Sequence, residues 1–245
     1  MIDAIRAEWI KLSTVTVTWV LAIIAVAFPL LVTILTATLA DTTWSGEELA
    51  GMVSGLLIVT AMLLGVVATI AVTNEFAHNT IRPTFAAMPD RWRPLLAKPI
   101  VQLVVTTIVA GATVAVCWVL GVVLSGDSPD LGEGTALPTL VGVVALAIGL
   151  ALLGVGLGLL IRNSAAAICI LLLWPLIAEG LIAGLLSVIG AEGGVRFLPY
   201  AAGFNMALTD PDPDGLGRLT GGIYFFAWVL AIGALGVLSA RRRDA

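Results

Sequence analysis

The sequence has 245 residues, of which 60% are hydrophobic and only 11% are charged, and its formal net charge is −4. A water-soluble domain carries roughly 25% charged residues, so this composition excludes an ordinary soluble protein and indicates a chain that lies in lipid. No nucleic-acid partner is expected. Cys117 and Cys169 both lie in apolar runs, which predicts buried thiols and no disulfide framework. With one histidine, His78, and no Cys/His cluster, the sequence predicts no metal site.

Residues 2–13 predict an amphipathic helix that lies in the membrane interface. Ile2, Ile5, Trp9 and Leu12 recur at helical spacing, and Trp9 is expected among the lipid headgroups. Glu8 and Lys11 belong to its polar positions. The alternative is the charged start of a signal peptide. The apolar run at 15–39 is longer than the core of about 7–15 residues that a signal peptide has, which favours the helix.

Six later stretches are apolar enough to cross the hydrocarbon, which takes roughly 20 residues. The fold class expected is therefore an all-α polytopic membrane protein, in which one transmembrane domain fills residues 1–245. Pro29 predicts a kink in the first span. The spans are predicted at 15–39, 51–73, 99–124, 139–161, 165–189 and 221–240.

Basic residues predict the orientation, because cytoplasmic segments carry an excess of Lys and Arg. Six crossings place ten of the twelve on one side of the membrane and leave Arg196 and Arg218 on the other. Both termini then lie in the cytoplasm, and ten of the sixteen acids lie outside. We expect a multi-pass protein of a bacterial cytoplasmic membrane.

The outer segment 190–220 carries more than a linker pattern. Phe197, Tyr200, Phe204 and Leu208 recur at steps of three and four residues. This spacing predicts a short amphipathic helix that lies on the outer leaflet, followed by a turn at Asp210–Gly215.

The polar stretch 74–98, NEFAHNTIRPTFAAMPDRWRPLLAK, is the longest on the cytoplasmic side. Its pattern predicts a short helix between turns, amphipathic through Phe76, Ile81 and Phe85. An ordinary positively charged loop that only orients the protein is the alternative. Such a loop does not explain the aromatic residues among the charges.

The sequence offers few residues suited to catalysis or to binding a cofactor. The pattern GxxxxGK[ST] is absent from the sequence, so ATP hydrolysis is not expected on this chain. The acids and His78 fall mostly on opposite sides of the membrane, so no catalytic set can be assembled. We expect no enzyme activity and no cofactor bound by this chain.

The segments Glu8–Lys11 and Thr73–Lys98 resemble those of the ABC-2 type permease family. Its bacterial members carry an acid after the second span, a GTIR-like turn, P-x-R and a Lys that opens the third span. The matching residues are Glu75, Asn79-Thr80-Ile81-Arg82, Pro89-Asp90-Arg91 and Lys98. Asn79 stands where Gly is frequent, so the turn there is open to change. Leu198-Pro199-Tyr200 is similar to a segment before the family's last span.

This resemblance implies the membrane half of an ABC exporter. Two six-span permeases pair as a homodimer or heterodimer, and a separate pair of ATPase subunits binds ATP and Mg. The stretch 74–98 would hold the coupling helix on which the ATPase docks. The docking residues implied are Glu75, Thr80, Arg82, Pro89, Arg91 and Lys98, and the interfacial helix beside them carries Glu8, Trp9 and Lys11.

Glu179 is the one acid well inside a predicted span. An ionised carboxylate near the bilayer centre costs roughly 2.5–3.5 kcal/mol on insertion scales. Pro175 removes a helical hydrogen bond nearby, so the backbone there needs another partner. One hypothesis places Glu179 and Pro175 on the translocation path or at a subunit interface. The other is a protonated or outward-reaching Glu without a transport role.

The expected function is an exporter permease that moves an amphiphilic or lipid-like compound by alternating access, in contact with membrane lipid. An ion-coupled secondary transporter is an alternative, but it would need several intramembrane ionisable groups. A non-transporting membrane partner subunit is the other. The cargo and the direction of transport do not follow from the residues.

Overall fold

The computed structural model describes residues 1–39, 43–80, 92–126 and 129–243, and these fold into helices without a strand. Within these residues six segments are long and apolar enough to cross a membrane, which confirms the predicted number of spans. The helices are α1 (Ile2–Thr14), α2 (Thr16–Leu39), α3 (Gly46–Ala77), α5 (Trp92–Ser125), α6 (Ala136–Ile161), α7 (Ser164–Leu173), the π-helix η1 (Trp174–Glu179), α8 (Gly180–Val188), the 3₁₀-helix η2 (Glu192–Phe197), α9 (Pro199–Phe204) and α10 (Arg218–Arg243).

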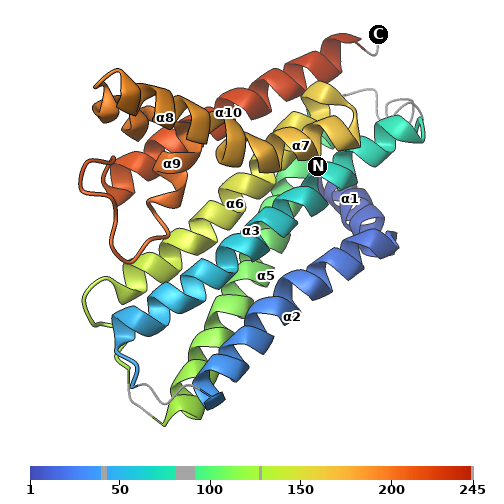
Figure 1. Cartoon of the computed structure of the whole chain (residues 1–245). Helices are drawn as coiled ribbons and strands as arrows, with labels where there is room; N and C mark the ends of the chain where they lie inside the picture. The colour runs from blue at the N-terminus through green and yellow to red at the C-terminus, as the bar shows by residue number, and fades with distance from the viewer. Residues whose placement is uncertain (40–42, 81–91, 127–128, 244–245) are drawn as a thin grey trace.

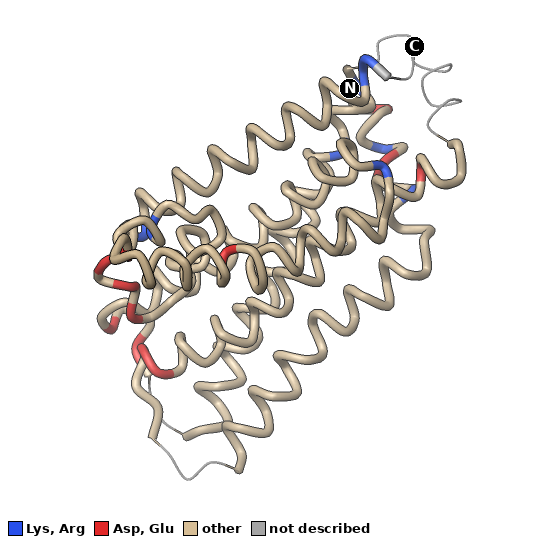
Figure 2. The backbone as a smooth tube through the Cα atoms, turned by 45° about the horizontal axis from the view of Figure 1, so that its top comes forward, with Lys and Arg blue, Asp and Glu red and all other residues tan. Residues whose placement is uncertain are grey.

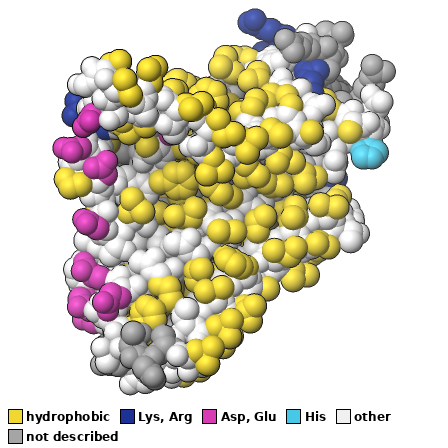
Figure 3. Space-filling view, in the orientation of Figure 1, with side chains coloured by type: hydrophobic (Ala, Val, Ile, Leu, Met, Phe, Trp, Pro, Cys, Tyr) yellow, Lys and Arg dark blue, Asp and Glu magenta, His cyan; other side chains and the backbone are white. Residues whose placement is uncertain are grey.

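Helices α3 and α6 run side by side through the centre of the bundle (Figure 1). Their most apolar windows are 56% and 72% buried, against 17–22% for the other four spans. Helices α2 and α5 pack on one side of this pair, and α7, α8 and α10 lie on the other. The outer helices thus keep a wide apolar surface, visible as the hydrophobic face in Figure 3, as a protein solvated by lipid must.

The two ends of the bundle carry opposite charge (Figure 2). Lys and Arg gather at the end where both termini lie, which we call the basic end, and Asp and Glu gather at the opposite, acidic end. The termini therefore share one side, as six crossings require.

At the acidic end, carboxylates cap the central helices. Ser45 and Glu48 form a capping box at the start of α3. Glu133 accepts a hydrogen bond from the Gly46 amide at 2.6 Å, and Glu47 accepts one from the Thr135 amide at the start of α6, also at 2.6 Å. The N-terminus of α3 thus meets a carboxylate from the segment before α6, and the N-terminus of α6 meets a carboxylate from α3. These bonds hold the two N-termini together.

Pro29 lies inside α2 and has no N–H to donate, so the carbonyl oxygen of Ala25 loses its helical partner. Thr60 of α3 replaces it by donating its hydroxyl to Ala25 O at 2.6 Å. All three residues are buried. In lipid no water can satisfy such a carbonyl, so this bond also fixes how α2 lies on α3.

The polar stretch predicted as a loop at 74–98 is shorter than expected. Helix α3 continues through Ala77, and α5 begins at Trp92. At 32 and 34 residues, both helices are longer than the hydrocarbon of about 30 Å requires. Polar partners for Glu75 and Lys98, described below, allow these turns to stay helical. The predicted short helix through Ile81 and Phe85 lies outside the described residues.

The segment 190–220 contains a short helix, α9, but α9 does not lie on the surface as expected. Tyr200, Ala202 and Gly203 are buried in the bundle, with the Tyr200 ring against Phe225. The irregular backbone that follows is satisfied by side chains from α3, from α10 and from the residue before α6. Ser54 donates to Ala207 O, and Thr135 and Arg218 both donate to Thr209 O. The segment therefore folds back into the bundle, because its carbonyls find donors there.

Gly142 of α6 allows this segment to approach, since a Cβ at this position would overlap the carbonyl oxygen of Met206. We expect Gly142→Ala to lower the free energy of unfolding by about 1–3 kcal/mol, the usual cost of overpacking. Gly184→Ala is the matched control, because nothing lies within 4 Å of that Cβ. Unfolding of purified protein in detergent measures both. Equal stability of the two variants would contradict the close approach.

Candidate functional site

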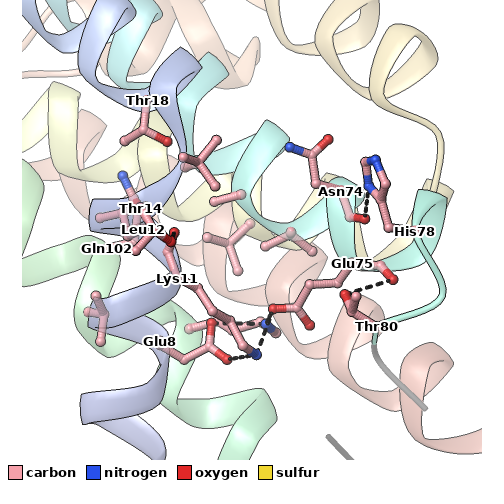
Figure 4. A pocket seen from close by; sticks show the side chains of 17 residues that line it. Glu8, Lys11, Leu12, Thr14, Thr18, Asn74, Glu75, His78, Thr80 and Gln102 are labelled. Carbon is pink, nitrogen blue, oxygen red and sulfur yellow. Dashed lines mark hydrogen bonds and ion pairs between the residues drawn. The ribbon is translucent and has the colours of Figure 1, made fainter. Parts of the chain in front are cut away.

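Four charged side chains from three helices meet at the basic end, and we call them the ion cluster: Glu8 and Lys11 of α1, Glu75 of α3 and Lys98 of α5. The Lys11 ammonium lies 2.9 Å from Glu8 and 3.1 Å from Glu75. The Lys98 ammonium lies 3.0 Å from Glu8 and also pairs with Glu75. Each carboxylate thus bridges both lysines in a closed ring (Figure 4).

The ion cluster is mostly withdrawn from solvent. The side chains of Lys98 and Glu75 are 4% and 7% exposed, and that of Glu8 is 10% exposed. Lys11, at 37%, is the member nearest to water. Removing one partner from such a group leaves a buried charge without compensation, which costs far more than the pairs gain over apolar packing. The cluster therefore holds α1 against the inner ends of α3 and α5.

Burial lowers the pKa of Lys11, but attraction by Glu75 and then by Glu8 outweighs it, so the pKa lies above its ordinary value. A lysine whose pKa is higher in the folded than in the unfolded state stabilises the fold at every pH below its unfolded-state pKa. This stabilisation is lost only as the pH rises through the folded-state pKa. Lys11 thus stays charged across the neutral range.

Helix α3 ends in a Schellman motif directly after the cluster. The Thr80 amide donates to Glu75 O at 2.9 Å, and the Asn79 amide donates to Phe76 O at 3.3 Å. Asn79 has φ 54°, the left-handed conformation that Gly favours and Asn tolerates. Asn79 therefore supports the tight turn that a Gly would give at this position.

Two guanidinium groups tie further helices to this end. Arg162, after α6, lies 4.8 Å from the ring centroid of Phe76 and donates to Ser239 O of α10. Arg241 of α10 lies 4.7 Å from the ring centroid of Trp92, at the start of α5. These cation–π contacts use the aromatic residues that the sequence placed among the charges of the polar stretch.

Of the predicted docking residues, the three that the structure describes differ in their exposure. Glu75 and Lys98 are buried in the ion cluster, and Thr80 lies exposed in the turn after α3. Arg82, Pro89 and Arg91 lie outside the described residues. On α1, Glu8 and Lys11 join the cluster, whereas Trp9 is 53% exposed and free to meet lipid. The ion cluster thus connects the predicted interfacial helix to the predicted docking stretch, with two residues from each.

A second polar arrangement, the outer clamp, joins η1 to α9. Glu179 accepts hydrogen bonds from the Tyr200 amide at 2.8 Å and the Ala201 amide at 2.9 Å. These amides lie in the first turn of α9, where no helical acceptor exists. Pro175 frees the carbonyl of Leu171, and the Tyr200 hydroxyl donates to it at 3.0 Å. The partner that the sequence required near Pro175 is therefore Tyr200.

The outer clamp gives Glu179 a role that neither hypothesis from the sequence contained. Its side chain is buried within the bundle, and both carboxylate oxygens bind the backbone of α9. It does not reach outward to solvent in this conformation. Its place on a translocation path stays a prediction.

A family model of ABC-2 family transporter proteins matches residues 4–178, from within α1 to the next-to-last residue of η1. The chain belongs to the ABC-2 transporter family. No curated protein matches the sequence. The matched part contains the whole ion cluster and ends one residue before Glu179, so both Glu179 and the α9 residues of the outer clamp lie beyond it.

Sequence reasoning missed several contacts of this ABC-2 protein. It treated Glu8 and Lys11 as parts of a surface helix, and it named Glu179 and Tyr200 without pairing them. The missing signal was tertiary, since Glu8 and Lys98 are 90 positions apart. No group of three His, Cys, Asp or Glu side chains within the described segments is placed to hold a metal ion.

For the ion cluster we expect Lys98→Met to lower the free energy of unfolding by about 3–5 kcal/mol, because it leaves Glu8 and Glu75 with one cation between them. Lys11→Met is the matched control and should cost clearly less, because Lys11 is partly exposed and its carboxylate partners keep Lys98. Denaturant unfolding in detergent measures the difference. Similar losses in both variants would argue against a buried Lys98.

For the outer clamp we expect Tyr200→Phe to cost about 1–3 kcal/mol, because it leaves Leu171 O buried without a donor. The control is Tyr224→Phe, which removes an equivalent bond to Phe197 O at an exposed site where water can replace it. Thermal unfolding of the two variants should separate them. A Tyr224 variant as destabilised as the Tyr200 variant would speak against the clamp.

Proposed function

We propose that this chain is the permease subunit of an ATP-driven ABC exporter, with its basic end in the cytoplasm and ATP and Mg bound by a separate ATPase subunit. The single observation that carries the proposal is the ion cluster, which joins α1 to the two helices on either side of residues 78–91. Membership of the ABC-2 family and the charge difference between the ends support it.

The cluster supports a mechanical coupling at the basic end. A partner that moves the segment between α3 and α5 acts first on Glu75 and Lys98. Separating these groups from α1 would leave buried charges unpaired, at a cost of several kcal/mol. The ends of α1, α3 and α5 therefore move together, and a local push becomes a rearrangement of whole helices.

In this proposal two such permeases pair and move an amphiphilic or lipid-like compound by alternating access. Arg82, Pro89 and Arg91 meet the ATPase, since their positions fall between the two helices that the cluster joins. Glu75 and Lys98 act indirectly, because their burial keeps them from a docking protein. Glu179 gives little support to ion-coupled transport, as both its oxygens already bind α9.

The test is purification of the tagged chain from its native membrane, with ATPase activity assayed on the purified complex. We expect a copurifying ATPase that is lost with the double variant Arg82→Ala/Arg91→Ala. Arg242→Ala is the control, because Arg242 is an exposed basic residue at the same end of the bundle.

The outcomes separate the candidate functions. Loss of the ATPase from the double variant but not from the control supports docking on this segment. A folded chain that never carries an ATPase overturns the exporter proposal. Transport in vesicles without ATP would then favour a secondary transporter, and its absence would favour a non-transporting partner subunit.

A further inference from the structure

A cleft of about 440 Å³ lies beneath α1, between the start of α2 and the inner ends of α3 and α5. Its volume falls in the range of small-molecule sites. The ion cluster, His78 and Asn74 line one side (Figure 4). The rest is largely apolar, formed by Leu12, Val15, Ala68, Ala71, Val72 and Val101. The cleft thus has the two-sided character of an amphiphile's binding site.

One polar atom at this cleft lacks a partner. Glu75 binds both lysines through Oε1, whereas Oε2 is buried and accepts no hydrogen bond within the part of the chain that the structure describes. The Glu75 side chain is more than nine-tenths buried. A carboxylate oxygen withdrawn from water without a donor is costly, so a bound molecule that brings an N–H or O–H to this oxygen would be stabilised.

The charges around the cleft limit which donor fits. Glu8 and Glu75 balance Lys11 and Lys98, so the cluster has no net charge, and the lone histidine of the sequence stands at the rim. An amine alone would bind Glu75 Oε2 but would leave an uncompensated positive charge beside two lysines. An amine joined to a phosphate carries no net charge. The partly exposed Lys11 lines the cleft, where its ammonium can bind the phosphate.

We propose that the cleft binds one aminophospholipid of the surrounding membrane. Its primary amine donates to Glu75 Oε2, its phosphate lies toward Lys11, and an acyl chain lies along the apolar wall. A choline lipid has the same charges but no N–H, so it cannot satisfy Glu75. The proposal does not rest on the transport function, because it needs neither a partner chain nor nucleotide.

The test compares two single-chain lipids that differ only in three methyl groups, palmitoyl lysophosphatidylethanolamine and palmitoyl lysophosphatidylcholine. Binding to the purified chain in detergent is titrated by native mass spectrometry. We expect the ethanolamine lipid to bind at least about tenfold more tightly, the usual worth of a hydrogen bond to a charged group. Hexadecyl phosphate, which has the anion and the chain but no amine, should bind as weakly as the choline lipid.

Three variants test whether the lipid binds in this cleft. Ala71→Leu fills the apolar wall one helical turn before Glu75 and should abolish the preference for ethanolamine. Ala234→Leu is the control, because the same change falls in the groove between α5 and α10. Thr18→Leu narrows the cleft from α2 and serves if Ala71→Leu does not fold.

The proposal is overturned if the ethanolamine and choline lipids bind equally. It also fails if hexadecyl phosphate binds as tightly as the ethanolamine lipid, because Lys11 would then account for the binding. A preference that survives a folded Ala71→Leu or Thr18→Leu variant would place the lipid elsewhere.

Discussion

The backbone of a chain in lipid must find all its hydrogen-bond partners within the protein, and this requirement determines how the helices of this ABC-2 protein meet. Pro29 and Pro175 each interrupt the hydrogen bonding of a spanning helix. The carbonyl that Pro29 frees is met by Thr60 of α3, and the carbonyl that Pro175 frees is met by Tyr200 of α9. Each of these two breaks therefore specifies a contact with a different helix.

The charged groups at the basic end likewise find their partners within the protein. Glu8, Lys11, Glu75 and Lys98 would each be costly to bury alone, but as a closed ring they satisfy almost every donor and acceptor. The ring makes α1 part of the bundle, although its Trp9 stays exposed. The interfacial helix is thus anchored by its polar residues, while its exposed apolar residues remain available to lipid.

Hydropathy predicted the six spans and the division of charge, because the length of an apolar run and the count of Lys and Arg are local properties. The need for a donor near Pro175 could also be predicted, since it follows from the missing N–H of one residue. The left-handed turn at Asn79 stayed open, because Gly is frequent at that position. Pairings could not. Nothing within a window around Glu179 indicates Tyr200, and a regular spacing of aromatic residues does not distinguish a helix on the surface from α9 folded into the bundle.

Helix α3 is held at both ends. At the acidic end Gly46 and Glu47 form hydrogen bonds with Glu133 and Thr135, just before α6, and about 43 Å away along the helix Glu75 belongs to the ion cluster. A rod fixed at two points transmits displacement along its axis and does not absorb it by bending. A force applied to the basic end of α3 would therefore be passed along the helix toward α6, against which α3 packs over its length. A displacement of α3 would therefore carry α6 with it, and the less buried helices around the pair would have to re-pack against it.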